Sequence, residues 1–297
     1  MRPDGWHLTE DVDDFHTRAG EFLRSRPALH TTPLTTIETL RTRGAGAFGA
    51  PSTPAPVLGR LERAGRVHAT FCLIRGLSLT HLTPEHADTL AAHLATHLTA
   101  LGRSLPFVSA DHDTATAFAE AWQRRTGATP TLRDRIRLYR LGTLTPPTPV
   151  PEGRGRLVGE QDRDQLMVFL REFTTDVREA ATIDADSWAS TRFADKHFTF
   201  WETPDGTPVS MAGATSMVGG MVRVDPVHTP AHLRGRGYAG AVTAEVSQAA
   251  LTAGATDVVL YADPANPTSN ALYQRIGYLP ITEWAVYDFA HAEPQAG

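Results

Sequence analysis

Several features that define common protein classes are scarce or missing in this sequence of 297 residues. The single cysteine, Cys72, cannot form an internal disulfide, which fits a reducing compartment such as the cytoplasm. Cys72 also lies in an apolar run, 67–74, where we expect a small core residue and not a nucleophile. No apolar run has the length of a transmembrane helix, and the first residues carry no signal-peptide pattern. The expectation is a cytoplasmic protein without a membrane partner.

The sequence also has no large excess of basic or acidic residues, with 28 Lys and Arg against 33 Asp and Glu. The net charge of −5 and the isoelectric point of about 6.2 predict no basic surface for nucleic acid. Neither a Gly-x-Ser-x-Gly elbow nor a Cys/His pair indicates a covalent nucleophile. His93 and His97, on a predicted helix over 84–101, have a spacing that can bind a metal ion. No third ligand stands near them in the sequence, so we expect no metal site.

The remaining composition is ordinary, with 41% hydrophobic and 21% charged residues, and the length suggests two domains. A proline-rich stretch, 144–153, is typical of a stiff, extended linker. The segments on either side of it look alike, because Trp122–Gly127 resembles Leu272–Gly277. Each half also contains a predicted hairpin, at 57–74 and 198–212. The chain therefore reads as a tandem duplication of one α/β unit.

The most informative stretch is 221–240. An apolar, β-branched run predicts a strand over 221–227, and apolar residues at helical spacing predict a helix from Ala239 to Ala253. Between them lies a loop that contains Arg234, Gly235, Arg236 and Gly237. The first turn of a helix leaves N–H groups unpaired, and the helix dipole adds a positive potential there. This order of elements predicts a site for a pyrophosphate.

Two interpretations of the loop compete. The pattern Gly235-x-Gly237-x-x-Gly240 satisfies the dinucleotide fingerprint, with Asp263 near the place of a ribose-binding acid. The dinucleotide fold, however, places this motif in its first βαβ unit and needs more strands than the remaining chain can supply. The alternative is Arg-x-x-Gly-x-Ala at 234–239, followed by a closing block at 266–278 with Asn266, Leu272-Tyr273 and Gly277-Tyr278. In these two blocks the sequence resembles the GCN5-related N-acetyltransferase (GNAT) superfamily.

The resemblance implies that the loop binds the pyrophosphate of acetyl-CoA as co-substrate. It also implies that the pantetheine arm enters between two splayed parallel strands. Main-chain groups just before the loop would contact that arm, and one N–H would polarise the thioester carbonyl. The residues expected at the cofactor are Val227, His228, Thr229, Arg234, Gly235, Arg236, Gly237, Tyr238, Ala239, Gly240, Asn266 and Tyr273.

The same resemblance places chemistry on Tyr273, whose phenol would protonate the departing thiolate as a general acid. Tyr273 can also simply pack its ring into the core, and Asn266 can simply form a turn before Pro267. The base that accepts the proton of the amine is left open by the sequence. Asp225 is the first candidate, because strand alternation puts it on the same face as Val227. Glu202 and His197 are weaker candidates.

The predicted fold class is α/β (an α+β mixed sheet), in two acyl-CoA N-acyltransferase-like units whose central mixed sheet is flanked by helices. We expect a degenerate domain at 1–145 and a catalytic, acetyl-CoA-binding domain at 153–297. In the first half, Thr116 and Gln123 stand where Asn266 and Tyr273 stand in the second. The first half does contain Arg41-x-x-Gly44-x-Gly46, but this pattern follows a helix and is expected to be a plain loop.

The expected function is transfer of the acetyl group of acetyl-CoA to an amine by direct attack in a ternary complex. The expected acceptor is a small-molecule amine or a peptide amine, and a homodimer stays open. One alternative is a non-catalytic acyl-CoA-binding sensor with the same fold. Another is a dinucleotide-binding oxidoreductase.

Overall fold

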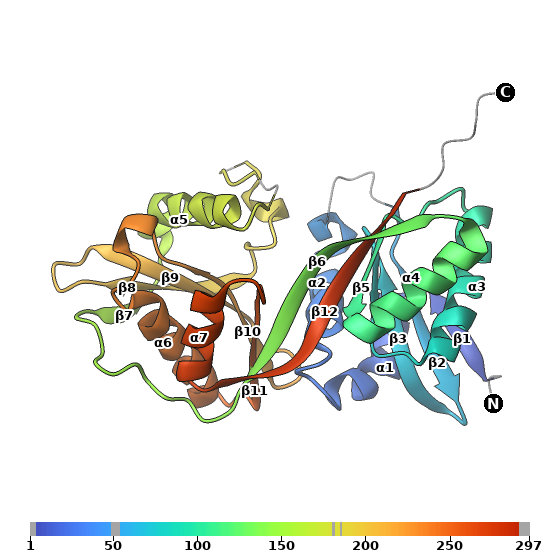
Figure 1. Cartoon of the computed structure of the whole chain (residues 1–297), viewed down its shortest axis with the longest axis horizontal. Helices are drawn as coiled ribbons and strands as arrows, with labels where there is room; N and C mark the ends of the chain where they lie inside the picture. Colours follow the sequence, from blue (N-terminus) through green and yellow to red (C-terminus); the bar gives the residue numbers. More distant parts are fainter. Residues whose placement is uncertain (1–3, 49–53, 180–181, 185, 291–297) are drawn as a thin grey trace. The chain divides into compact units, whose positions relative to one another are not determined.

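The computed structural model describes residues 4–48, 54–179, 182–184 and 186–290 (Figure 1). The chain forms two compact units. Unit 1 runs up to Arg137 and includes the residues from Thr282 onward, whereas unit 2 is Leu138–Ile281. Each unit combines one sheet with helices, so the predicted fold class is confirmed.

Unit 1 contains both strands and helices, as expected for an α/β unit. Its elements are β1 (Gly5–Thr9), α1 (Val12–Arg24), α2 (Thr31–Arg43), η1 (Ala45–Phe48), β2 (Val57–Arg63), β3 (Arg66–Leu73), β4 (Leu77–Leu79), α3 (Pro84–Ala100), β5 (Phe107–Asp111), α4 (His112–Thr126) and most of β6 (Thr129–Leu141).

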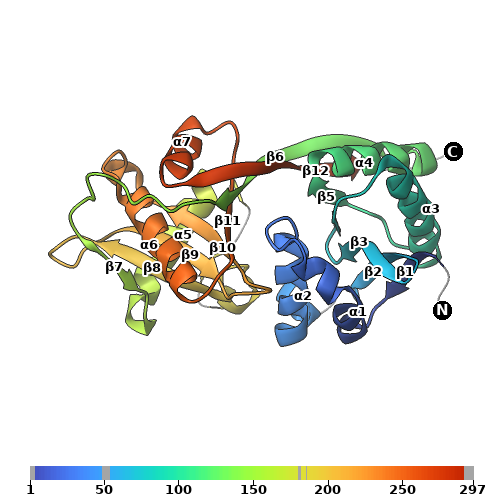
Figure 2. The ribbon, with the colours of Figure 1, turned by 90° about the horizontal axis from the view of Figure 1, so that it is seen from below.

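The sheet of unit 1 has the strand order β1-β2-β3-β4-β5-β12-β6. The predicted hairpin at 57–74 is the antiparallel pair β2–β3. Figure 2 shows α1 and α2 on one side of β1–β3, with α3 and α4 on the other. Apolar side chains from the sheet and from α3 and α4 form one core. Cys72 is buried in β3, and burial raises the pKa of its thiol to about 12, which confirms it as a core residue.

Unit 2 contains the motifs that the sequence singled out. Its elements are β7 (Arg154–Leu157), η2 (Glu160–Asp162), α5 (Arg163–Asp176), η3 (Trp188–Ser190), β8 (Lys196–Glu202), β9 (Pro208–Thr215), β10 (Met221–His228), η4 (Ala231–Leu233), α6 (Tyr238–Thr252), β11 (Asp257–Ala262), α7 (Pro267–Arg275) and the start of β12 (Tyr278–Ala290).

The sheet of unit 2 has the order β7-β8-β9-β10-β11-β6. Its strands are antiparallel from β7 to β10, and β10 then pairs in parallel with β11. In Figure 1, α5 covers one face of the sheet, and α6 and α7 lie on the other. Two cores result: one joins α6 to β10 and β11, and the other packs α5 onto β8 and β9. The predicted helix at 239–253 is confirmed as α6.

Two long strands, β6 and β12, each begin in one unit and end in the other. The second half of β12 pairs with β5 from Trp284↔Asp111 to Asp288↔Phe107, and Ala285 and Phe289 are buried in the unit 1 core. The compact units therefore differ from the predicted domains 1–145 and 153–297. The C-terminal strand completes the sheet of unit 1, because its apolar face is buried there.

The proline-rich segment 144–153 belongs to unit 2 and packs against other parts of that unit. The N–H of Thr145 donates to the Ile276 carbonyl, and the Trp201 indole donates to the Glu152 carbonyl at 3.2 Å. The extended segment is therefore held along the surface of the unit that contains the glycine-rich loop. No helix in the described part of the chain is long and apolar enough to cross a membrane.

Gly59 provides a test of packing in unit 1. It lies on β2 opposite Phe71, and an added Cβ would stand 2.0 Å from the Phe71 ring. We predict that Gly59→Ala lowers the free energy of unfolding by roughly 1–3 kcal/mol, because overpacking displaces the ring. Gly46→Ala is the control, since nothing lies within 4 Å of its added Cβ. Chemical denaturation measures both, and Phe71→Leu should offset part of the Gly59→Ala loss. An unchanged midpoint for Gly59→Ala would contradict this packing.

Candidate active site

The candidate site lies where the pairing between the two parallel strands of unit 2, β10 and β11, ends. β10 and β11 pair from Met221↔Asp257 to Val224↔Leu260. β10 continues to His228, but its register against β9 shifts between Val224 and Val227. Pro226 lies within this shift and has no N–H for the ladder. The described parallel pairing thus ends before the residues that were predicted to contact a pantetheine arm.

The glycine-rich loop after β10 presents unpaired N–H groups. Gly235 and Gly237 have φ angles of 80° and 85°, a region that residues with a Cβ rarely adopt. Gly237 is the N-cap of α6 and offers no side chain to cap it. Ala241 donates to the Gly237 carbonyl, so the helix ladder begins only there. Within the described residues, the N–H groups of residues 235–240 have no acceptor, as the predicted anion site requires.

The two arginines of the loop differ in what they contact. Arg234 Nε donates to the Thr229 carbonyl at 3.0 Å, and its NH2 group contacts Asp176 at 2.5 Å. Arg234 thus fixes the loop to α5. Arg236 is exposed and, among the described side chains, has no partner. Arg236 is therefore the charge of the loop that is available to a ligand.

The proline-rich segment lines the start of α6. A Cβ on Gly237 would meet Pro151 at 3.8 Å, and a Cβ on Gly240 would meet Pro147 at 3.8 Å and Leu272 at 3.9 Å. These are ordinary van der Waals distances, so the prolines lie beside the helix start and would contact even a small side chain there. The first turn of α6 is therefore supported from outside by prolines.

The end of β10 is held by buried polar contacts. The His228 side chain is 3% exposed, and its Nε2 lies 2.9 Å from the Glu172 carboxylate on α5. Thr229 shares a hydrogen bond of 2.8 Å with Ser210, a buried pair on the same face. The side chains of His228 and Thr229 are therefore structural, and their carbonyls also accept hydrogen bonds, from the Ser210 hydroxyl at 2.8 Å and from Arg234 Nε at 3.0 Å.

Tyr273 lies on α7 with its ring 6.4 Å from that of Tyr139 and 6.2 Å from that of Tyr278. Its hydroxyl has no hydrogen-bond partner among the described residues, as a proton donor to a ligand requires. Burial raises the pKa of Tyr273 above its ordinary value, and the negative charge of Asp225 raises it further. The phenol therefore stays protonated at neutral pH.

The helix that presents Tyr273 is anchored by two asparagines. Asn266 caps α7 by accepting from the Ser269 N–H at 3.1 Å, so its side chain has the structural role that the sequence left open. Asn270 is buried, donates to the carbonyls of Asp263 and Asn266, and accepts from the Tyr139 hydroxyl at 2.5 Å. This network fixes α7 relative to β6 and β11.

Asp225, the candidate base, sits in a cluster of charges. Its carboxylate contacts the Lys196 ammonium and the Arg192 guanidinium, the latter at 2.5 Å. Arg192 also binds the Glu179 carboxylate through two nitrogens at 2.7 Å each. Burial alone would raise the pKa of Asp225, but the charges of Lys196, Arg192 and Arg223 outweigh it and hold the pKa well below its ordinary range. Asp225 is thus a permanent carboxylate and a weak proton acceptor.

Lys196 is a further candidate site residue, which the motifs did not indicate. It is the only lysine in the 297-residue sequence, and its side chain is 4% exposed. Burial, with the charges of Arg192 and Arg223, lowers the pKa of Lys196 to about 8, although the charge of Asp225 opposes the shift. The sequence composition contained one indication of this residue. All other basic residues of the Lys/Arg type are arginines, and a lysine differs from an arginine in that burial readily shifts its pKa.

The other candidates have structural partners or lie apart. Glu202 is buried at the far end of β8, where its carboxylate accepts from Arg156 Nε at 2.7 Å. His197 lies 3.3 Å from the Ser216 hydroxyl. In the first half, Arg41 lies in the last turn of α2 and pairs with Asp13 at 3.0 Å. Gly44 ends α2 and Gly46 lies in η1, so the segment predicted as a plain loop is a helix end followed by a short 3-10 helix. Across the described residues, no group of three or more His, Cys, Asp or Glu side chains can hold a metal ion.

Known proteins share this architecture. The sequence profile of a family described as FR47-like protein matches residues 215–285, which contain β10, the glycine-rich loop, α6, β11 and α7. No curated protein matches the sequence.

Solved structures extend the likeness over nearly the whole chain. A GCN5-related N-acetyltransferase from Sphaerobacter thermophilus has a TM-score of 0.59 at 16% identity and covers 99% of both chains. A GCN5-related N-acetyltransferase from Kribbella flavida has a TM-score of 0.52 at 18% identity, over 75% of this chain and 87% of that one. A tandem GNAT protein from the clavulanic acid biosynthesis pathway, solved without AcCoA, has a TM-score of 0.55 at 14% identity, over 98% and 99%.

These structures share an acetyltransferase-type fold, and one of them is described as tandem. The chain has the GNAT fold in a tandem arrangement, and the resemblance drawn from the motifs is confirmed at that level.

The single lysine allows a direct test of the charge cluster. Lysine labelled with ¹³C at Cε gives one side-chain signal, whose pH titration reports Lys196 alone. We predict a midpoint near 8, lowered mainly by burial. Asp225→Asn should move the midpoint lower still, because the carboxylate favours the ammonium form. Asp205→Asn, in an exposed turn, should leave it unchanged. A midpoint near the ordinary lysine value of about 10.4 would contradict the burial of this ion pair.

Proposed function

We propose that the protein is an acetyl-CoA-dependent N-acetyltransferase, with cofactor and chemistry in unit 2. The observation that supports this most is the row of N–H groups from Gly235 to Gly240 without acceptors. Two positive-φ glycines and a helix start hold these donors in one place. A diphosphate satisfies several such donors at once, and an added Cβ at Gly235 would meet nothing within 4 Å, so the approach is open.

The geometry also favours the acyl-CoA over a dinucleotide. A Rossmann-type site has its loop directly after a strand that stays paired with its parallel neighbour. Here β10 runs on past its described parallel pairing with β11 and passes through Pro226. Main-chain groups of Val227, His228 and Thr229 follow that point, where an extended pantetheine arm would lie alongside them.

The chemistry then needs a donor for the leaving sulfur and a site for the proton of the amine. Tyr273, with its free and protonated hydroxyl, would give a proton to the thiolate as the C–S bond breaks. Asp225 would accept a hydrogen bond from the attacking amine and stabilise the positive charge that develops on its nitrogen. Lys196 would take up the proton through Asp225 when its own amine is neutral, which its pKa of about 8 permits.

The acceptor in this proposal is a small-molecule amine or a peptide amine. It would approach the cluster of Asp225 and Arg192, where Phe173 and Phe193 flank the guanidinium at 5.8 and 4.3 Å from their ring centres. An acyl-CoA-binding sensor without turnover is the second candidate, since the pKa of Asp225 makes it a weak base when it acts alone.

Gly237→Asp tests the cofactor site. The substitution places a carboxylate at the start of α6 and forces a side chain into a backbone with φ of 85°. We predict that the dissociation constant for acetyl-CoA rises roughly a hundredfold, because like charges meet at the diphosphate. Gly254→Asp is the matched control: it has φ of 94° at the other end of α6 and should bind normally. Isothermal titration calorimetry measures the dissociation constant of acetyl-CoA for each variant. Equal constants for the two variants would refute the proposed pyrophosphate site.

Tyr273→Phe tests the acid. We predict that release of CoA in the presence of an accepted amine falls roughly 10²-fold or more, while acetyl-CoA affinity is kept, because the phenol acts in the transition state. The control is Tyr287→Phe, whose hydroxyl is 3.1 Å from Thr116 in unit 1. A panel of amines identifies the acceptor. Unchanged turnover in Tyr273→Phe would remove the acid role, and no turnover of the unaltered protein with any amine would favour the sensor.

A further inference from the structure

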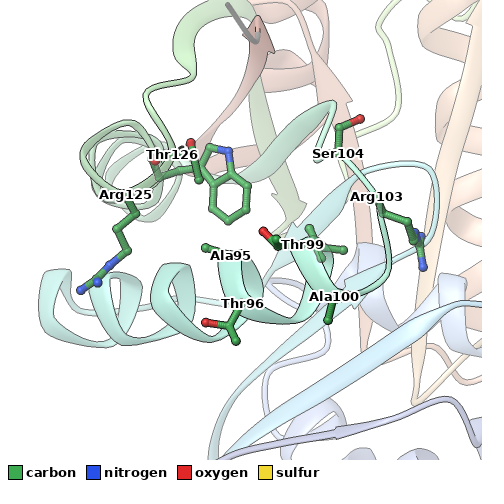
Figure 3. A pocket seen from close by; sticks show the side chains of 10 residues that line it. Ala95, Thr96, Thr99, Ala100, Arg103, Ser104, Arg125 and Thr126 are labelled. Carbon is green, nitrogen blue, oxygen red and sulfur yellow. Dashed lines mark hydrogen bonds between the residues drawn. The ribbon is translucent and has the colours of Figure 1, made fainter. Parts of the chain in front are cut away.

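Unit 1 contains a cavity of its own, far in sequence from the glycine-rich loop. It lies between the C-terminal ends of α3 and α4 and the chain that follows α3 (Figure 3). Its volume is about 710 Å³, within the range of small-molecule sites. The described residues that line it are Ala95, Thr96, Leu98, Thr99, Ala100, Arg103, Ser104, Trp122, Arg125 and Thr126.

One side chain that lines this cavity, Trp122, has a buried hydrogen-bond donor without an acceptor in the described part of the chain. Trp122 is 3% exposed, and its indole N–H is buried without a hydrogen-bond partner among the described residues. The ring is fixed by stacking on Phe118 at 5.9 Å and by a tilted contact with Phe289 at 6.1 Å. A buried donor without an acceptor costs free energy, and a ligand in the cavity can supply the acceptor.

The described charged side chains that line the cavity are all positive. Arg103 and Arg125 carry positive charge, and the lining residues that are described include no aspartate or glutamate. Figure 3 shows these two arginines at opposite sides of the drawn group, with Thr99 between them. Arg103 uses one nitrogen on the Ala55 carbonyl at 3.3 Å, and Arg125 uses one on Asp88 at 2.5 Å, so each keeps further N–H groups. The cavity thus offers donors and positive charge around a flat apolar wall.

We propose that this cavity binds a small organic anion, a carboxylate with a flat apolar body. The carboxylate would accept from the Trp122 indole N–H, and the positive charges of Arg103 and Arg125 at the two sides of the cavity would favour an anion over a neutral ligand. Its body would pack on the indole face and on Ala95 and Leu98. This proposal concerns the unit for which the sequence predicted no chemistry, and it does not depend on the proposed acetyl transfer.

Phenylacetate is the probe, and phenylacetamide is its neutral counterpart. Titration into the ¹⁵N-labelled full-length chain should shift the indole N–H signal of Trp122, identified by its loss in Trp122→Phe. Five tryptophans give five such signals, so the other four serve as internal references. We expect saturable binding of phenylacetate and binding at least about tenfold weaker for phenylacetamide, because a hydrogen bond to a charged acceptor is the stronger one.

Arg103→Gln should weaken phenylacetate binding at least about tenfold and keep the fold, because the residue lies at the cavity edge. Arg124→Gln is the control: it removes one arginine charge next to Arg125, but Arg124 does not line the cavity. Trp122→Phe should have an effect similar to that of Arg103→Gln, and the arginine variant decides alone if Trp122→Phe is unstable. Equal binding of acid and amide, no shift of the Trp122 signal, or equal effects of both arginine variants would overturn the proposal.

Discussion

The proposed cofactor site of unit 2 depends on a set of N–H groups at the start of α6 that have no acceptor among the described residues. The first turn of every helix leaves its N–H groups without intrahelical acceptors, and a capping side chain commonly accepts from one or two of them. At α6 no described side chain does so. Here the reason lies in the chain: Gly235 and Gly237 adopt positive φ angles, and the N-cap of α6 is a glycine without a capping oxygen. A serine or aspartate cap would stabilise the helix by roughly a few tenths of a kcal/mol relative to glycine and would occupy one or two of the same donors. The start of α6 is less stable by this amount because its N-cap is a glycine.

Around this site the polar side chains divide into those that hold the fold and those left free. Arg234, His228 and Asn270 are bound to Asp176, Glu172 and neighbouring main-chain groups, and they fix the loop, the end of β10 and α7. Arg236 and the Tyr273 hydroxyl have no partner in the part of the chain that is described. Such a division is expected at a binding site, because fixed neighbours preorganise the groups that act.

Local signals predicted the fold and the loop well. The strand at 221–227, the helix from 239, both hairpins and the closing block come from patterns within a few residues, and each lies where expected. The exchange of β12 into unit 1 could not be predicted, because the alternating pattern of that strand fits either sheet and only long-range pairing decides. The Asp225–Lys196 pair was missed for the same reason. Its two residues lie on different strands, and burial, not spacing, sets their pKa values.

The most direct measurement compares acetyl-CoA with pantetheine, which lacks the diphosphate, by following the backbone amide signals of the ¹⁵N-labelled protein. The account predicts that acetyl-CoA shifts the amides of Gly235, Gly237 and Gly240 strongly and that pantetheine leaves them in place. Equal shifts with both ligands, or large shifts elsewhere with none in this loop, would contradict it.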